Sequence, residues 1–143
     1  MLYLSYSSCG SLISKVGEFL KEIEGILSSE CLKELALDDI KGELSRLAPY
    51  LKVIFSRWVP EIIYALYLKR RLSFNEMKKA FGISSRVLTD KLRLLEEYGL
   101  VKKEVDTSTR PIRVYYELTN SGKEVGLALI PLLTILKGKV KSI

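Results

Sequence analysis

The chain has 143 residues, of which 48% are hydrophobic and 28% are charged, and its formal net charge is +6. This length and composition predict one soluble globular domain and exclude a disordered or fibrous protein. Histidine is absent, which removes the usual general base and a common metal ligand, so we expect neither an enzyme nor a metal site, and no cofactor.

The positive charge is concentrated in the second half of the chain. Residues 1–68 contain seven Lys/Arg and nine Asp/Glu, whereas residues 69–143 contain sixteen and eight. Such segregation is typical of a surface that binds phosphates. The alternative is the solvated surface of a thermophile-like protein, because Lys and Glu are abundant, Gln is absent and only two Asn occur.

The two cysteines and the apolar segments indicate a cytoplasmic protein. Cys9 and Cys31 provide neither a disulfide framework nor zinc-finger spacing, and a reducing compartment suits them. The N-terminus lacks the basic region of a signal peptide. The apolar run at residues 125–136 is shorter than the roughly 18 residues needed to cross a bilayer, so we expect no membrane partner.

Residues 1–50 are predicted to form a helical extension. Apolar residues spaced by four and three predict a helix over 11–28 with a coiled-coil-like seam of Leu12, Val16, Phe19, Ile23 and Ile26. A second helical stretch follows at 32–47, where Asp38-Asp39 is a candidate break, and Pro49 marks the join to the next segment. Packing against a partner helix and packing within the chain both explain the apolar seam.

The next helix is predicted to begin near Pro60 and to run through Leu68, because proline is accepted in a first turn. Lys69, Arg70 and Arg71 close it. Cations there complement the helix dipole, and they would also lie beside a DNA backbone, so both roles remain open.

Residues 73–98 are predicted to form a helix-turn-helix. Ser73 and Glu76 have capping-box spacing at the start of a short helix that ends near Ala80. A turn at 81–83 follows, and Ser84 caps a longer helix whose apolar face is Leu88, Leu92 and Leu95. In this motif the longer helix enters the DNA major groove.

The polar face of the longer helix has side chains that read base edges. Arginine donates two hydrogen bonds to guanine, and threonine contacts base edges or a thymine methyl. We therefore assign base contacts to Ser85, Arg86, Thr89 and Arg93. Contacts with the sugar-phosphate backbone of DNA are assigned to Lys69, Arg70, Arg71, Ser73, Asn75, Lys78, Lys79 and Ser84. For the serines, a purely capping role is the alternative.

A β-hairpin wing is predicted after Gly99. The runs 100–105 and 113–118 have β-rich composition, with Val114, Tyr116 and Leu118 pointing inward. Cations at a hairpin tip can contact the adjacent minor groove of DNA or its phosphate backbone. The candidate wing residues are Thr107, Ser108, Arg110 and Arg113. The fold class is therefore mainly α with a small β-hairpin wing: a winged helix-turn-helix with extra N-terminal helices and a C-terminal helix.

Three motifs resemble the HxlR family of winged-helix transcriptional regulators, relatives of the MarR group. They are VIFSRW, FGISSRVLTDKLRLLEEYGLVKKEV and PIRVYYELTNSG, within residues 51–137. The resemblance implies a homodimeric DNA-binding regulator with its recognition helix at Ser84 to Tyr98, its wing at Asp106 to Arg113 and terminal helices at the dimer interface. The C-terminal helix is expected to begin near 119–121, where Ser121 and Glu124 have capping-box spacing.

The chain departs from the family pattern at two places. Many members carry a sensor cysteine about a dozen residues before the tryptophan, but none occurs around Ser45, and Cys31 lies too far upstream to align with it. The N-terminal extension is the second departure. We expect it either to enlarge the dimer interface or to add a site for another partner. The candidate dimer-interface residues are Leu12, Val16, Phe19, Ile23, Leu129, Leu132, Leu133 and Leu136.

The sequence thus predicts a sequence-specific regulator that binds double-stranded DNA as a homodimer. The family resemblance implies that this regulator is a repressor. The domain division is 1–50, 51–120 and 121–143. A winged-helix module for protein contacts is the alternative function. A small-molecule effector stays open as a further partner, although no residue pattern in the sequence supports one.

Overall fold

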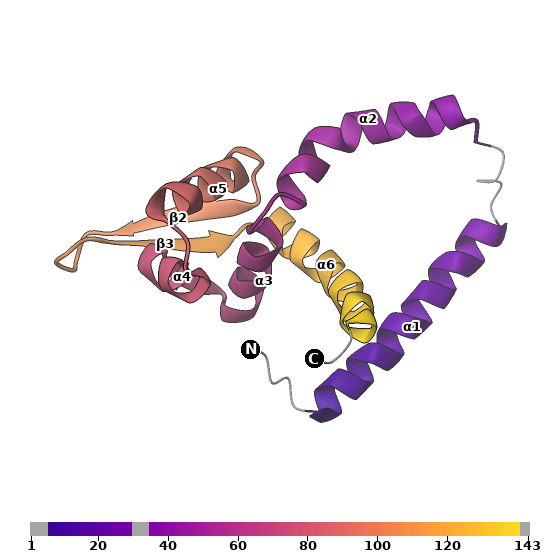
Figure 1. Cartoon of the computed structure of the whole chain (residues 1–143), viewed down its shortest axis with the longest axis horizontal. Coiled ribbons are helices and arrows are strands. Elements are labelled where there is room, and N and C mark those ends of the chain that lie inside the picture. The colour runs from indigo at the N-terminus through magenta and orange to yellow at the C-terminus, as the bar shows by residue number, and fades with distance from the viewer. Residues whose placement is uncertain (1–5, 30–34, 141–143) are drawn as a thin grey trace. The chain divides into compact units, whose positions relative to one another are not determined.

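The computed structural model describes residues 6–29 and 35–140 (Figure 1). Its elements are α1 (Tyr6–Ser29), α2 (Leu37–Ile54), α3 (Val59–Lys69), β1 (Arg71–Ser73), α4 (Phe74–Phe81), α5 (Ser85–Glu97), β2 (Val101–Asp106), β3 (Arg113–Leu118) and α6 (Asn120–Lys139). The predicted fold class is confirmed. Within the described ranges, no helix has the length and apolar character that a membrane span requires.

The chain divides into two compact units. One comprises residues 47–130 and contains the winged helix-turn-helix, and the other comprises residues 1–46 with 131–143. The helices α2 and α6 each continue across a boundary between the units, and each has a proline close to that boundary, Pro49 and Pro131.

The prediction that Pro49 marks a join between helices is wrong, because Pro49 lies inside α2. Proline has no N–H for the Ser45 carbonyl, but both residues are exposed, so water can bond to that oxygen. The expected break at Asp38-Asp39 is also absent. These carboxylates occupy the first turn of α2, where they favour the positive end of the helix dipole.

The helix-turn-helix forms as predicted, because its caps are local. The Ser73 hydroxyl accepts a hydrogen bond from the Glu76 N–H at 3.1 Å, and the Ser73 N–H donates to the Glu76 carboxylate at 3.3 Å. Gly82 ends α4 with φ +62°, a conformation that favours glycine. Ser84 accepts from the Val87 N–H at 3.2 Å and so caps α5.

The core of residues 47–130 holds α5 in place. The predicted apolar face of Leu88, Leu92 and Leu95 is 1% exposed or less. It packs with residues of α3, α4, the sheet and α6, among them Val59, Ile62, Ile63, Leu66, Met77, Tyr116, Leu118 and Leu129. Burial of this face fixes which side of α5 meets the solvent.

The strand β1 was not predicted. Arg71 was expected to close α3, but α3 ends at Lys69 and Arg71 begins a strand that pairs antiparallel with β3, opposite Glu117. The sheet order is β1-β3-β2. Three residues are too few for an alternation pattern, and β1 exists only because β3 supplies its hydrogen bonds. The predicted inward positions Tyr116 and Leu118 are buried, and Val114 is half-buried.

The junction between β3 and α6 differs from the prediction in its cap. Thr119, not Ser121, precedes the helix, and its hydroxyl accepts from the Gly122 N–H at 3.1 Å. The same hydroxyl donates to the Gly99 carbonyl at 2.6 Å, and the Thr119 N–H donates to the Leu100 carbonyl at 3.0 Å. These bonds to residues distant in sequence hold Thr119 at the start of the helix. The spacing of Ser121 and Glu124 cannot predict such bonds.

The predicted apolar seam of α1 is only partly covered. Val16 is buried and Leu12 is half-buried, whereas Phe19, Ile23 and Ile26 are exposed. A groove of about 440 Å³ lies within this unit between α1 and residues 134–138 of α6. Cys9 falls in α1, and Cys31 lies outside the described residues.

Candidate nucleic-acid interface

The exposed face of α5 carries the residues assigned to base contacts. Ser85, Arg86, Thr89 and Arg93 are all exposed, and the two arginines lie on the side of the helix away from its buried leucines. Arg86 and Arg93 are seven residues apart, which separates their Cα atoms by about 10 Å along the helix axis. A face of this length matches a short run of base edges in a major groove.

The guanidinium groups of this face are available to a ligand. Across the described ranges, no ion pair joins Arg86 or Arg93 to a carboxylate. Asp90 is exposed four residues after Arg86 and is the acidic residue of this face. A carboxylate there repels phosphate and can accept a hydrogen bond from a cytosine amino group, so it favours base edges over nonspecific backbone contact.

A second group of predicted residues lines a groove between α4 and the hairpin. The groove has a volume of about 510 Å³, and its lining is Ser73, Phe74, Asn75, Glu76, Lys79, Ile112, Arg113 and Val114. Lys79 and Arg113 supply its cations, while the Glu76 carboxylate accepts the Ser73 N–H in the capping box. The groove therefore combines polar groups at a helix start with two cations, which is a chemistry suited to phosphate.

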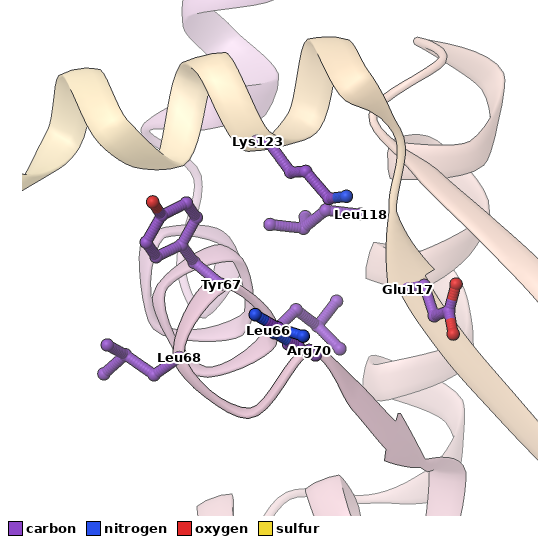
Figure 2. Close-up of a pocket in the computed structure, with 7 residues that line it drawn as sticks. All are labelled: Leu66, Tyr67, Leu68, Arg70, Glu117, Leu118 and Lys123. Atoms are coloured by element: carbon purple, nitrogen blue, oxygen red, sulfur yellow. The ribbon is translucent and has the colours of Figure 1, made fainter.

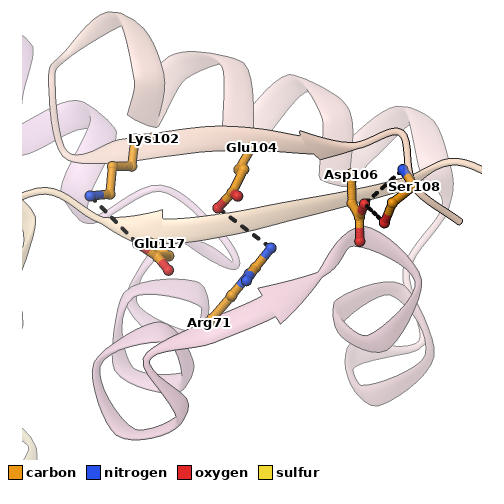
Figure 3. Close-up of polar contacts among 6 residues, drawn as sticks. All are labelled: Arg71, Lys102, Glu104, Asp106, Ser108 and Glu117. Carbon is orange, nitrogen blue, oxygen red and sulfur yellow. Dashed lines mark hydrogen bonds and ion pairs between the residues drawn. The ribbon is translucent and has the colours of Figure 1, made fainter.

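The tip of the wing is organised by Asp106 (Figure 3). Its carboxylate accepts hydrogen bonds from the Ser108 N–H at 2.9 Å and from the Ser108 hydroxyl at 2.5 Å. These bonds lower the pKa of Asp106, because they stabilise the ionised carboxylate. Thr107, within this turn, and Arg110, two residues beyond it, are exposed, so the tip presents a cation.

Two cross-strand ion pairs brace the sheet below the tip (Figure 3). Arg71 reaches from β1 to Glu104 of β2, with 3.4 Å between the guanidinium nitrogen and the carboxylate oxygen, and Lys102 pairs with Glu117 at 3.5 Å. The Arg71 guanidinium also lies 4.0 Å from the ring centroid of Tyr115. Exposed pairs such as these contribute about 0–1 kcal/mol each, so their main effect is on the orientation of the strands.

Arg71 is predicted to contact the DNA backbone from the end of α3, but in the structure it is the first residue of strand β1. Its guanidinium is engaged by Glu104 and Tyr115 on the sheet. Arg113 is also engaged, since a hydrogen bond with the Tyr115 side chain raises its pKa. Tyr115 is thus the residue that sequence reasoning missed, because its role depends on the unpredicted strand β1.

The remaining predicted backbone contacts are accessible. Lys78 is exposed near the end of α4, and Lys69 and Arg70 are exposed at the end of α3. The hydroxyls of Ser73 and Ser84 act as caps, which was the alternative role given to them. Each hydroxyl keeps its own hydrogen, so capping does not prevent donation to a phosphate.

Within the part of the chain that the structure describes, no three His, Cys, Asp or Glu side chains gather where they could hold a metal ion.

Comparison with known proteins agrees with this fold. A family model described as HxlR-like helix-turn-helix matches residues 53–141, more than half of the chain. The HTH-type transcriptional regulator YvaP of Bacillus subtilis (strain 168) is 39% identical over 82 residues, which cover 57% of this chain and 70% of that protein.

Solved structures give the same result. A MarR-family transcriptional regulator from Enterococcus faecalis V583 aligns with a TM-score of 0.57 and 31% identity, over 66% of this chain and 86% of that one. The redox regulator HypR in its oxidized form aligns with a TM-score of 0.58 and 26% identity, over 68% and 99%.

Proposed function

Because this chain belongs to the HxlR-like helix-turn-helix family of transcriptional regulators, we propose that it acts by binding specific sites on double-stranded DNA. The observation that carries the proposal is the exposed face of α5, where Arg86, Thr89 and Arg93 lie opposite a fully buried apolar face. Family and relatives are regulators, so an enzymatic role has no support.

The proposed binding mode places α5 in the major groove. Ser85, Arg86, Thr89 and Arg93 would contact base edges. Phosphates would be held at the groove between α4 and the hairpin, with Lys79, Asn75 and Ser73 as donors. The exposed Arg110 at the wing tip would reach the neighbouring minor groove or backbone.

Arg86→Ala should weaken binding to the cognate site by about 1–3 kcal/mol and relax the base preference at one position. The reason is that a guanidinium facing a base edge contributes to sequence discrimination. Lys79→Ala, by contrast, should weaken cognate and random DNA alike and reduce the slope of log affinity against log salt by about 1. Fluorescence anisotropy with both DNAs at several salt concentrations measures these effects. Equal losses for Arg86→Ala on cognate and random DNA would contradict the assignment.

The alternative function, a module for protein contacts, makes a different prediction in the same experiment. Random DNA should bind at low salt and be released steeply as salt rises if phosphates are the partner. Absence of any binding at low salt would favour the alternative.

We also propose that the protein is a homodimer and a cytoplasmic repressor. Phe19 and Ile23 on α1, and Leu132 and Leu136 on α6, are between 37% and 49% exposed, an apolar exposure that a second copy would cover. Leu12 and Leu133 are half-buried, while Val16 and Leu129 are already buried within their own units. A dimer would place two copies of α5 on half-sites about one helical turn apart.

Phe19→Asp should shift the chain from dimer to monomer, because a carboxylate in a covered apolar surface loses its hydration. Sedimentation equilibrium at micromolar concentration measures the association. Lys21→Ala, on the same helix and exposed, should leave it unchanged. A wild-type chain that sediments as a monomer would refute the dimer.

A further inference from the structure

A cavity lies within residues 47–130, where α3 and β3 end and α6 begins (Figure 2). Its volume is about 650 Å³, and its lining is Leu66, Tyr67, Leu68, Arg70, Glu117, Leu118 and Lys123. These residues lie at the end of β3 opposite to Arg113 and the wing tip. The cavity is thus separate from the groove assigned to phosphate, and its size is that of a small-molecule site.

Two cations of the lining are uncommitted. In the described ranges no ion pair joins Arg70 or Lys123 to a carboxylate. Figure 2 shows Lys123 extending from α6 toward Leu118, and Arg70 beside Leu66. Glu117 is the acidic residue of the lining, but it is paired with Lys102 at 3.5 Å and its carboxylate points away from the other lining side chains. The cavity therefore offers positive charge to an occupant.

The backbone at Arg70 supports a role for its side chain. Arg70 has φ +66° and ψ −47°, close to the strained γ-turn conformation that residues other than glycine rarely adopt. Such a conformation costs about 1–3 kcal/mol and is typical of functional positions. Glycine would form this turn at lower cost, so the presence of arginine points to use of the guanidinium.

The rest of the lining is apolar. Leu66 and Leu118 are 1% and 3% exposed and belong to the core, so they form a fixed floor with little open surface. The accessible apolar surface is that of Leu68, which is 36% exposed, and of the half-buried Tyr67 side chain. A fully hydrated inorganic anion gains nothing from this apolar surface. An anion with an apolar body gains from both the surface of Tyr67 and Leu68 and the cations.

We propose that this cavity binds a small organic carboxylate with an apolar body, held by Arg70 and Lys123 against the side chains of Tyr67 and Leu68. Arg70 directly precedes β1, and Glu117 lies opposite Arg71 in the β1-β3 pairing. An occupant would therefore touch the base of the sheet that bears the wing. Only this regulatory consequence rests on the proposed function, because binding itself needs no DNA.

The test uses benzoate as the probe, titrated into the full chain without DNA and followed by amide chemical shifts. Saturable shifts at Leu66, Tyr67 and Leu118 are expected, with weaker binding of the uncharged isostere benzamide. Arg70→Gly relieves the strained backbone, so it should fold, and it should weaken benzoate binding about ten-fold, as should Lys123→Met.

Lys52→Gln, which removes an exposed cation of α2 outside the cavity, should leave benzoate affinity unchanged. No saturable shifts at the lining, equal benzoate affinity in wild type and Arg70→Gly, or inorganic phosphate binding as tightly as benzoate would each overturn the proposal. Anisotropy with random DNA tests the proposed DNA binding separately from the proposed carboxylate site. Benzoate can bind in the cavity whether or not the chain binds DNA.

Discussion

Gly122→Ala should destabilise the winged-helix unit by about 3 kcal/mol, the upper end of the usual cost of overpacking. A Cβ at this position would stand 2.0 Å from the Leu100 carbonyl oxygen and 3.1 Å from Cδ2 of Leu118. That oxygen cannot withdraw easily, because it accepts the Thr119 N–H at 3.0 Å at the start of α6. Urea denaturation followed by circular dichroism measures the loss.

Gly138→Ala is the matched control on the same helix. No atom lies within 4 Å of a Cβ built at Gly138, and alanine is the better helix former, so stability should be unchanged or raised by up to about 1 kcal/mol. A loss below about 1 kcal/mol for Gly122→Ala would show that the turn adapts and that the close approach to Leu100 is not a constraint.

Leu92→Ala should lower the free energy of unfolding by about 2–5 kcal/mol, the range for a large-to-small change in a core. Leu92 is 1% exposed and lies among the buried residues that fix α5. Denaturation by urea, monitored on the same signal as above, measures this loss. DNA affinity of the fraction that remains folded should fall less than for Arg86→Ala, whose side chain is exposed and whose removal should leave stability nearly unchanged.

Val87→Ala provides the control for position on α5. Val87 is 37% exposed, so its truncation should cost less than about 1 kcal/mol. If both truncations cost the same, the burial difference across α5 would not be what holds the helix, and the orientation of Arg86 would need another explanation.

The elements that sequence predicted well are those with local causes. The capping box of Ser73 and Glu76, the left-handed Gly82 and the cap at Ser84 act within a few residues, and the spacing of Leu88, Leu92 and Leu95 identifies the buried face of α5. The same residues carry the family resemblance that the family model confirms. The exposed face of α5, and with it the candidate reading surface, follows from this local information.

The wrong predictions have two different physical causes. Pro49 is predicted to mark a join, but it lies in an exposed stretch of α2, where water can bond to the Ser45 carbonyl and the helix continues. At the start of α6, by contrast, a residue distant in sequence decides the cap. Ser121 had the spacing of a cap, but Thr119 takes that place because its hydroxyl also reaches the Gly99 carbonyl. Neither outcome can be read from periodicity.

By itself, then, the sequence determined the helix-turn-helix, the hairpin and the face of α5 that meets solvent, since capping and helical periodicity act over one or two turns. Only the tertiary structure decided β1, the engagement of Arg71 by Glu104 and Tyr115, and the cavity beside Arg70. Each of these depends on residues brought together from separate elements. Strand pairing and cross-strand ion pairs leave no periodic signal in the partners, so residues at the end of α3 that looked alike in sequence have different surroundings in the fold.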